Sequence, residues 1–294
     1  MVSQLIDVGG VRLHVAEMGS GSPVVLLHGF TGSARAMAGV ANGLSDTHRT
    51  LSIDLVGHGR SAVPPDAAAY SMTACVGQLA AVLDELGLHD AHLIGYSMGG
   101  RAALAFGAAH PARMRSALLV GARAGIRDRQ QRAKRVRDDE ALARRIEREG
   151  VEAFVDFWIS QPFLVNTRRL GARGVADARQ MRLSNSIRGL AASLRGMGPG
   201  AQPPIHEALA RIDAPICLAV GEEDLKFRAL AAEISQELPN ARIEIVPDAG
   251  HSAHTDNPAA FLQLARGFLA EAEVRKTTLH PAAEAAPPTQ MRTT

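Results

Sequence analysis

One short segment limits what this chain can fold into more than any other: the G-x-S-x-G pattern of residues 95–99. An apolar run at 91–94 leads into it, and an alanine-rich helical pattern leaves it. In such an elbow the serine lies on a strained strand-to-helix turn, and the glycines let the strand and the helix approach closely. The context therefore predicts a turn that exposes the Ser97 hydroxyl, although the motif alone also fits an ordinary glycine-rich turn.

The segments on either side of this turn alternate between strand-like and helix-like patterns. A hairpin is expected over 4–18, followed by strands at 23–27, 50–54 and 116–120 and by helices at 33–44, 71–86 and from the elbow to about 109. Alternation of this kind is the signature of a parallel sheet with helices on both faces. The expected fold class is therefore α/β.

Two further strand-like runs, at 215–220 and 243–246, are each followed by a residue suited to catalysis. Asp224 comes 127 residues after Ser97, and His251 comes 27 residues after Asp224. A serine needs a histidine to accept its proton, and the histidine needs a carboxylate to fix its tautomer. Nucleophile, acid, histidine is the chain order of the α/β-hydrolase fold. We therefore expect that fold, with Ser97, Asp224 and His251 as its catalytic triad.

Each triad residue has a simpler interpretation when taken singly. His251 could be a surface histidine, and Asp224 could cap a helix that starts at residue 225. His58, in a Gly-His-Gly turn, and His254, three residues after His251, are alternative bases. Three residues in the right order, each just past a strand end, favour the triad over these readings.

The oxyanion hole of such an enzyme uses two backbone N–H groups. One belongs to the residue after the nucleophile, which is Met98 here, and the other follows an early strand of the sheet. The strand at 23–27 ends in His28-Gly29-Phe30, so we expect Phe30 to supply the second N–H group. His28 itself is interpreted as structural.

The strand and helix alternation breaks after residue 121. The pattern is then helical and polar-rich from 127 to about 194, with Phe154, Phe157 and Trp158 clustered, until two prolines at 203–204. We expect an inserted helical cap. The expected organisation is an N-terminal core part at 1–121, a cap at 122–203, a C-terminal core part at 204–273 and a disordered tail at 274–294.

Composition describes an ordinary globular protein: 294 residues, 46% hydrophobic and 21% charged. There is no basic leader and no run of about eighteen apolar residues, so we expect a cytoplasmic protein without a signal peptide or membrane span. A net charge of +2 argues against a nucleic-acid or membrane partner. No phosphate-binding, dinucleotide or metal-ligand pattern occurs, so no cofactor and no metal are expected. The oligomeric state stays open, and a monomer is compatible with the sequence.

Charge is unevenly distributed along the chain. Residues 121–200 hold 17 Lys and Arg against 9 Asp and Glu. Most of these charges are interpreted as solvated helix faces. A sharper interpretation is that a few arginines point inward over Ser97 and hold an anionic substrate, because a guanidinium makes two parallel hydrogen bonds to a carboxylate.

Several strings are more specific than the elbow: GYSMGGR at 95–101, FVDFW at 154–158, RLSN at 182–185, GLAASLRGMG at 189–198 and GEEDLKF at 221–227. With them, residues 10–270 resemble the 2-succinyl-6-hydroxy-2,4-cyclohexadiene-1-carboxylate synthases of menaquinone biosynthesis. The resemblance implies a carbon–oxygen lyase, in which the triad removes a proton from the succinyl arm and pyruvate leaves without an acyl-enzyme.

The same resemblance implies a small tricarboxylate as substrate. By motif position it places carboxylate-binding arginines at Arg101, Arg135 and Arg182, with Tyr96 and Trp158 lining the pocket. The alternatives are a serine carboxylesterase or a carbon–carbon bond hydrolase of the same fold, and a non-catalytic hydrolase-like binding protein. The complete triad disfavours the binding protein, whereas only the cap arginines separate a synthase from an esterase.

Overall fold

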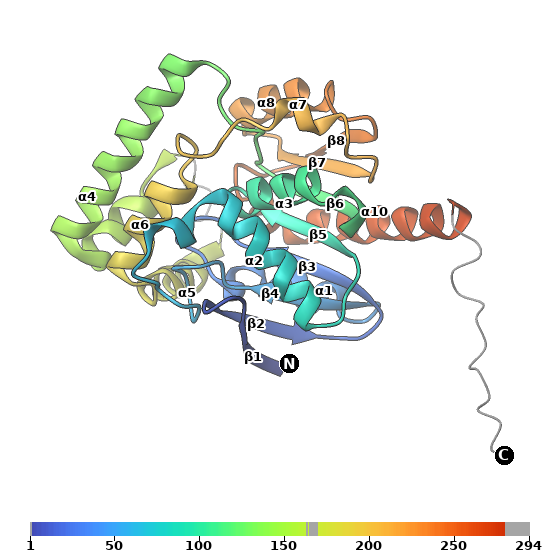
Figure 1. Ribbon diagram of the computed structural model, residues 1–294, viewed down its shortest axis with the longest axis horizontal. Coiled ribbons are helices and arrows are strands. Elements are labelled where there is room, and N and C mark those ends of the chain that lie inside the picture. Colours follow the sequence, from blue (N-terminus) through green and yellow to red (C-terminus); the bar gives the residue numbers. More distant parts are fainter. Residues whose placement is uncertain (1, 163, 165–169, 280–294) are drawn as a thin grey trace.

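The computed structural model describes residues 2–162, 164 and 170–279. Its centre is an eight-stranded sheet with the strand order β1-β2-β4-β3-β5-β6-β7-β8 (Figure 1). Strands β3 to β8 are parallel, and β2 pairs antiparallel with both β1 and β4. The strands are β1 (Val2–Asp7), β2 (Arg12–Met18), β3 (Ser22–Leu27), β4 (His48–Ile53), β5 (Ala91–Tyr96), β6 (Met114–Val120), β7 (Ile216–Gly221) and β8 (Ala241–Val246). The predicted, mostly parallel sheet is confirmed.

Helices cover both faces of the sheet, which explains why its central strands are apolar throughout. In β3, Val25 and Leu27 face one apolar core, while Val24 and Leu26 face the other. The first core also holds side chains of α2 (Met72–Glu85), α3 (Met98–Ala109) and α8 (Leu225–Ser235), and the second those of α1 (Ala38–Leu44) and α10 (Pro258–Leu279). Ser71 caps α2, because its side chain accepts a hydrogen bond from the Ala74 N–H.

Short elements complete the sheet layer. They are the 3-10 helices η1 (Ala34–Met37), η2 (Ala67–Tyr70) and η3 (Pro111–Arg113), and the one-turn helices α7 (His206–Leu209) and α9 (Ala253–Asp256). In the described part of the chain, no helix is long and apolar enough to cross a membrane.

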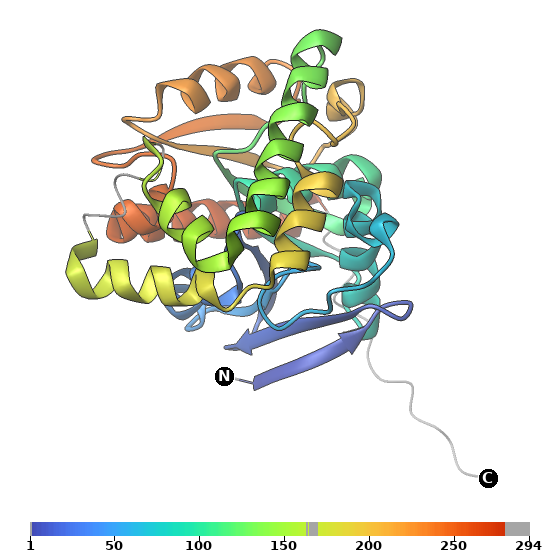
Figure 2. The ribbon, with the colours of Figure 1, turned by 90° about the vertical axis from the view of Figure 1, so that its left-hand side faces the viewer.

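Between β6 and β7 the chain leaves the sheet and forms three longer helices, here called the cap helices: α4 (Arg129–Ile159), α5 (Gly171–Leu183) and α6 (Ile187–Met197). They lie together beside the sheet (Figures 1 and 2). Helix α4 bends at Gly150, whose φ of 81° suits glycine. Phe154 lies in a small apolar core between α4 and α6, and Phe157 and Trp158 pack against it.

The C-terminal helix is longer than the sequence predicts. The sequence predicts a disordered tail from residue 274, but α10 continues to Leu279. That boundary is wrong because residues 270–276 are mostly good helix formers, and Phe268, Leu269 and Ala272 anchor the preceding turns in the core. The rest of the expected tail, 280–294, lies outside the described residues.

The close approach of α3 to β3 gives a stability prediction. A Cβ atom at residue 99 would overlap the backbone carbonyl of Leu27, whereas one at Gly77, within α2, would meet nothing within 4 Å. Gly99→Ala should therefore lower the free energy of unfolding by about 1–3 kcal/mol. Gly77→Ala, the matched control, should raise it by up to about 1 kcal/mol. Urea unfolding followed by circular dichroism measures both, and equal effects would contradict the close approach.

Candidate active site

Ser97 lies on the turn between β5 and α3, in a conformation that few non-glycine residues adopt. Its φ is 51° and its ψ is −104°. Its N–H donates to the Val120 carbonyl over 2.7 Å, and its carbonyl accepts from the Arg101 N–H over 3.0 Å. Gly95 and Gly99 make this geometry possible, because a Cβ at either position would overlap neighbouring backbone. The turn therefore holds the Ser97 side chain at the edge of the sheet.

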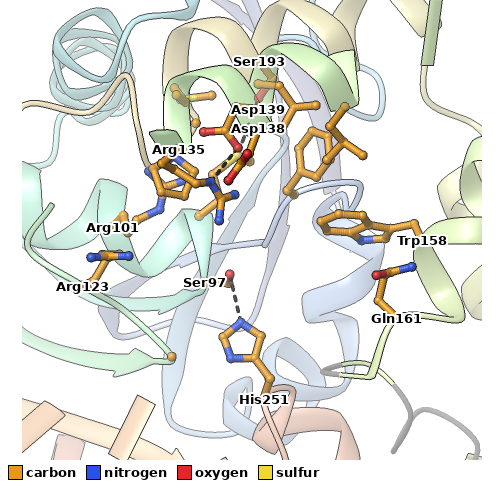
Figure 3. Close-up of a pocket in the computed structure, with 18 of the residues that line it drawn as sticks. Ser97, Arg101, Arg123, Arg135, Asp138, Asp139, Trp158, Gln161, Ser193 and His251 are labelled. Carbon is orange, nitrogen blue, oxygen red and sulfur yellow. Dashed lines mark hydrogen bonds and ion pairs between the residues drawn. The ribbon is translucent and has the colours of Figure 1, made fainter. Parts of the chain in front are cut away.

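The loops after β7 and β8 bring the other two predicted triad residues to this edge. His251 lies with Nε2 3.1 Å from the Ser97 Oγ (Figure 3). Its Nδ1 lies 2.8 Å from the Asp224 Oδ2. Asp224 also caps α8 by accepting from the Phe227 N–H over 3.2 Å, so its helix-cap reading and its triad position coexist. The Phe227 ring, 4.4 Å from that of His251, shields the imidazole from solvent. The three side chains form one hydrogen-bonded chain.

The two predicted oxyanion donors border the same cavity. Neither the Phe30 N–H nor the Met98 N–H has an acceptor within the described residues, so both are available to a bound oxygen. His28 holds the Phe30 loop in place: its Nδ1 donates to the Gly29 carbonyl over 2.8 Å, and its Nε2 accepts from the Leu55 N–H over 3.0 Å. This agrees with a structural role for His28.

Above Ser97 the sheet edge and the cap helices enclose a cavity of about 450 Å³. It is bordered by the triad, by Phe30 and Met98, and by side chains from α3, α4, α6 and α8. Of the residues predicted from the resemblance, Arg101, Arg135 and Trp158 line it. Figure 3 shows Arg101 and Arg135 on one side and Trp158 on the opposite side. One wall of the cavity is thus cationic and the other aromatic.

Arg101 is a buried cation without an acidic partner. Its side chain is 6% exposed, its Nη1 donates to the Gln202 amide oxygen over 2.7 Å, and it forms no ion pair with any described residue. Burial, together with neighbouring Arg135, lowers its pKa to about 10. Arg135 differs, because its Nε donates to the Asp139 carboxylate over 2.8 Å. A buried charge that lacks a counterion is costly, and a bound anion would remove that cost.

Arg182 and Tyr96 lie elsewhere, in contrast to their predicted position in the same pocket. Both line a second, smaller cavity of about 210 Å³. The Tyr96 hydroxyl is held by Ser252 at 2.7 Å, and α5, which carries Arg182, is anchored at its end by Asn185, whose side chain donates to the Thr31 carbonyl over 2.8 Å. Neither residue lines the cavity that holds Ser97.

Among the polar cavity residues that the sequence did not predict are Arg123, Gln161 and Lys226. Arg123 comes three residues after the end of β6, and Lys226 five residues after the end of β7. The triad residues also follow strand ends, so a position shortly after a strand was the sequence feature that could have identified Arg123 and Lys226. Gln161 follows α4 and carried no comparable signal.

The alternative bases are poor ones. Burial is the main cause that lowers the pKa of both His58 and His254 to about 3, so both rings are neutral near pH 7. Neither borders the cavity that holds Ser97. Across the described ranges, no group of three or more His, Cys, Asp and Glu side chains is arranged to hold a metal ion.

Comparisons with known proteins agree with this geometry. Residues 22–258 match the family model of the alpha/beta hydrolase fold. A Bacillus subtilis (strain 168) protein, provisionally named a 2-succinyl-6-hydroxy-2,4-cyclohexadiene-1-carboxylate synthase, is 41% identical over 88% of this chain and 95% of its own length. The chain belongs to this synthase family.

Solved structures agree with that family and also include an esterase. MenH from S. aureus superposes with a TM-score of 0.83 at 28% identity, over 89% of this chain and 98% of its own. A thermophilic esterase from Thermogutta terrifontis, solved with malate bound, gives a TM-score of 0.79 at 28% identity, over 92% and 99%. The synthase family therefore uses a scaffold that also carries esterases.

The hydrogen-bonded chain predicts a non-additive pattern of losses. Ser97→Ala, Asp224→Asn and His251→Ala should each lower kcat by roughly 10³-fold or more, because the three act as a unit. The Ser97→Ala/His251→Ala double variant should be little worse than either single variant. His89→Ala, which changes a histidine that is 86% exposed, is the control and should keep full activity. Steady-state kinetics decide: losses that multiply would contradict the triad.

Proposed function

We propose that this chain eliminates pyruvate from 2-succinyl-5-enolpyruvyl-6-hydroxy-3-cyclohexene-1-carboxylate to give 2-succinyl-6-hydroxy-2,4-cyclohexadiene-1-carboxylate. The observation that carries the proposal is the juxtaposition of a hydrogen-bonded Ser97, His251 and Asp224 with the buried, unpaired Arg101 in one cavity. Family membership supports it, because named relatives carry the same activity in their names. Such a cavity suits a small, multiply anionic substrate.

The positions of the double bonds identify the proton that is lost. The substrate ring has one double bond, at C3, and the product ring has two, at C2 and C4. The C2–H electrons therefore form the C2=C3 bond, the former C3=C4 pair forms C4=C5, and the C5–O bond breaks. The leaving enolate takes a proton on carbon and becomes pyruvate. The acidic proton is thus on the ring carbon that bears the succinyl group, rather than on the arm itself.

Ser97 and His251 act as a proton relay in this scheme. His251 accepts the hydroxyl proton of Ser97 through Nε2, 3.1 Å away, and the Ser97 oxygen removes the C2 proton. Asp224, 2.8 Å from Nδ1, stabilises the imidazolium that forms. The conversion needs no bond between Ser97 and the substrate, and its electron balance needs no oxidant or reductant.

The backbone donors stabilise the charge that develops in this step. Removal of the C2 proton moves negative charge onto the adjacent succinyl ketone oxygen. The Phe30 and Met98 N–H groups, which have no acceptor within the described residues, are the donors proposed for that oxygen. The role is the one they would have toward a tetrahedral intermediate in an esterase, so the same turn serves both reactions.

The second candidate is a carboxylesterase. The triad and the free backbone donors support an esterase as well as they support a synthase. An esterase of known structure also superposes over 92% of this chain. The unpaired Arg101 disfavours it, since a neutral ester would leave that charge buried without a counterion. Two experiments separate the candidates.

Removal of the Arg101 charge tests the substrate class. Arg101→Met keeps the apolar stem but loses a charge-assisted contact worth about 2–4 kcal/mol, so kcat/KM on the tricarboxylate should fall roughly 30- to 1000-fold. Any hydrolysis of neutral p-nitrophenyl acetate should change less than about threefold. The control is Arg144→Met, on the exposed face of α4. Equal losses on both substrates would contradict an anion-binding role.

Detection of a covalent adduct tests the reaction type. A relay should release pyruvate from the enolpyruvyl substrate without a burst and without an adduct on Ser97, whereas an esterase accumulates an acyl-enzyme under favourable conditions. Coupled pyruvate detection and mass spectrometry of the quenched enzyme read out the two results. Absence of pyruvate together with rapid acylation by simple esters would overturn the synthase proposal in favour of the esterase.

A further inference from the structure

The cavity above Ser97 contains more positive charge than its own acids neutralise. Its three carboxylates all have partners: Asp138 pairs with Lys134 at 2.7 Å, Asp139 with Arg135 at 2.8 Å, and Asp224 with His251 at 2.8 Å. Three cavity cations form no ion pair with a described residue, and they are Arg101, Arg123 and Lys226. Three unpaired cations match the three carboxylates of the proposed substrate.

The local backbone fixes the position of Arg123 before any ligand binds. Gly121, at the end of β6, has a φ of 59°, and a Cβ there would overlap the His251 ring. The chain therefore turns beside the catalytic histidine two residues before Arg123. The Arg123 Nε donates to the Gly125 carbonyl over 3.3 Å, and the Ala124 carbonyl accepts from the Ile205 N–H over 2.9 Å. The two terminal nitrogens of the Arg123 guanidinium, Nη1 and Nη2, donate to no protein acceptor in the described part of the chain.

Arg123 lies on the cationic side of the cavity. Figure 3 shows it next to Arg101 and Arg135, opposite Trp158 and Gln161. Its half-burial lowers its pKa, and Arg135 lowers it further. The pKa of Lys226 falls for the same reasons, with Arg135 and Arg123 both contributing to the fall. These like charges repel one another, and a multiply charged anion would relieve the repulsion.

Because of the position of Arg182, the Ser97 cavity has one carboxylate-binding arginine fewer than the resemblance implies. The resemblance assigns three carboxylate-binding arginines, but Arg182 lines the second cavity and not the one that holds Ser97. Arg101 and Arg135 remain, and Arg135 is already paired with Asp139. A substrate with three carboxylates in the Ser97 cavity therefore needs a further cation.

We propose that Arg123, assisted by Lys226 at the rim, forms a carboxylate subsite on the sheet side of the cavity and determines specificity for a tricarboxylate. The inference rests on the proposed function and deepens it. Arg123 is a substrate-binding residue in this scheme and takes no part in proton transfer, because the triad is complete without it.

Kinetics on the enolpyruvyl tricarboxylate test the subsite. Arg123→Gln should raise KM about tenfold or more and leave kcat within about twofold, because the contact is equal in the ground and transition states. Arg123→Lys should restore part of the loss by returning the charge. The control is Arg127→Gln, four residues along, since Arg127 pairs with Glu237 and does not line the cavity. An Arg123→Gln enzyme that matches the Arg127→Gln enzyme would overturn the subsite.

Binding of an unreactive tricarboxylate separates this inference from the proposed function. Tricarballylate should bind the unaltered protein and the Arg127→Gln variant alike, and Arg123→Gln at least about fivefold more weakly, by isothermal titration calorimetry. If the unaltered protein releases no pyruvate, the proposed function fails while calorimetry still tests the subsite. Equal tricarballylate affinities of Arg123→Gln and Arg127→Gln, or no binding to the unaltered protein, would overturn the subsite. Circular dichroism verifies folding of each variant.

Discussion

The strained turn at Ser97 is the constraint on which the rest of the site depends. A φ of 51° at a serine costs energy of order 1–3 kcal/mol, so the surrounding structure has to enforce it. Two backbone hydrogen bonds do so, one from the Ser97 N–H to Val120 in the next strand and one from the Arg101 N–H back to Ser97. The same two bonds hold this turn beside His251 and place Arg101 one helical turn beyond Ser97. The residues proposed for proton transfer and for anion binding therefore share a single piece of backbone.

The cap helices turn that edge into an enclosed space. Helix α6 lies against the elbow, with the Ser193 hydroxyl 3.6 Å from the Met98 sulfur. On the outside, Arg195 of α6 bridges Glu140 and Glu147 of α4. Exposed pairs of this kind contribute little each, so the buried apolar contacts of Phe154 and Leu190 carry most of the helix–helix packing. The arginines of the cap helices therefore differ in role: Arg144, Arg145, Arg148, Arg179 and Arg195 form ion pairs on the surface, whereas Arg135 lines the cavity.

The sequence sufficed to predict the features that depend on local chemistry. The elbow, the strand ends and the chain order brought Ser97, Asp224 and His251 together correctly because each follows a strand of one parallel sheet. The residues that the cap and neighbouring loops position were harder. The Tyr96 hydroxyl is held by Ser252, and the helix that carries Arg182 is anchored through Asn185 to Thr31; both partners are distant in sequence, so no local pattern encodes which cavity these side chains line. The end of α10 was missed because good helix formers continue past the expected boundary.

The asymmetry of the cavity bears on the chemistry that such an edge can perform. Arg101, Arg123 and Arg135 lie on one side and Trp158 on the other, so a ligand is oriented by its charge before the reacting carbon meets Ser97 (Figure 3). Orientation is what an elimination on a ring requires, because one C–H bond has to face the base while the leaving oxygen stays beyond its reach. An esterase needs less precise orientation of its substrate, since the ester carbonyl has only to reach the serine and the two N–H donors. The unpaired charges therefore favour the lyase reaction on a tricarboxylate over the hydrolysis of a neutral ester.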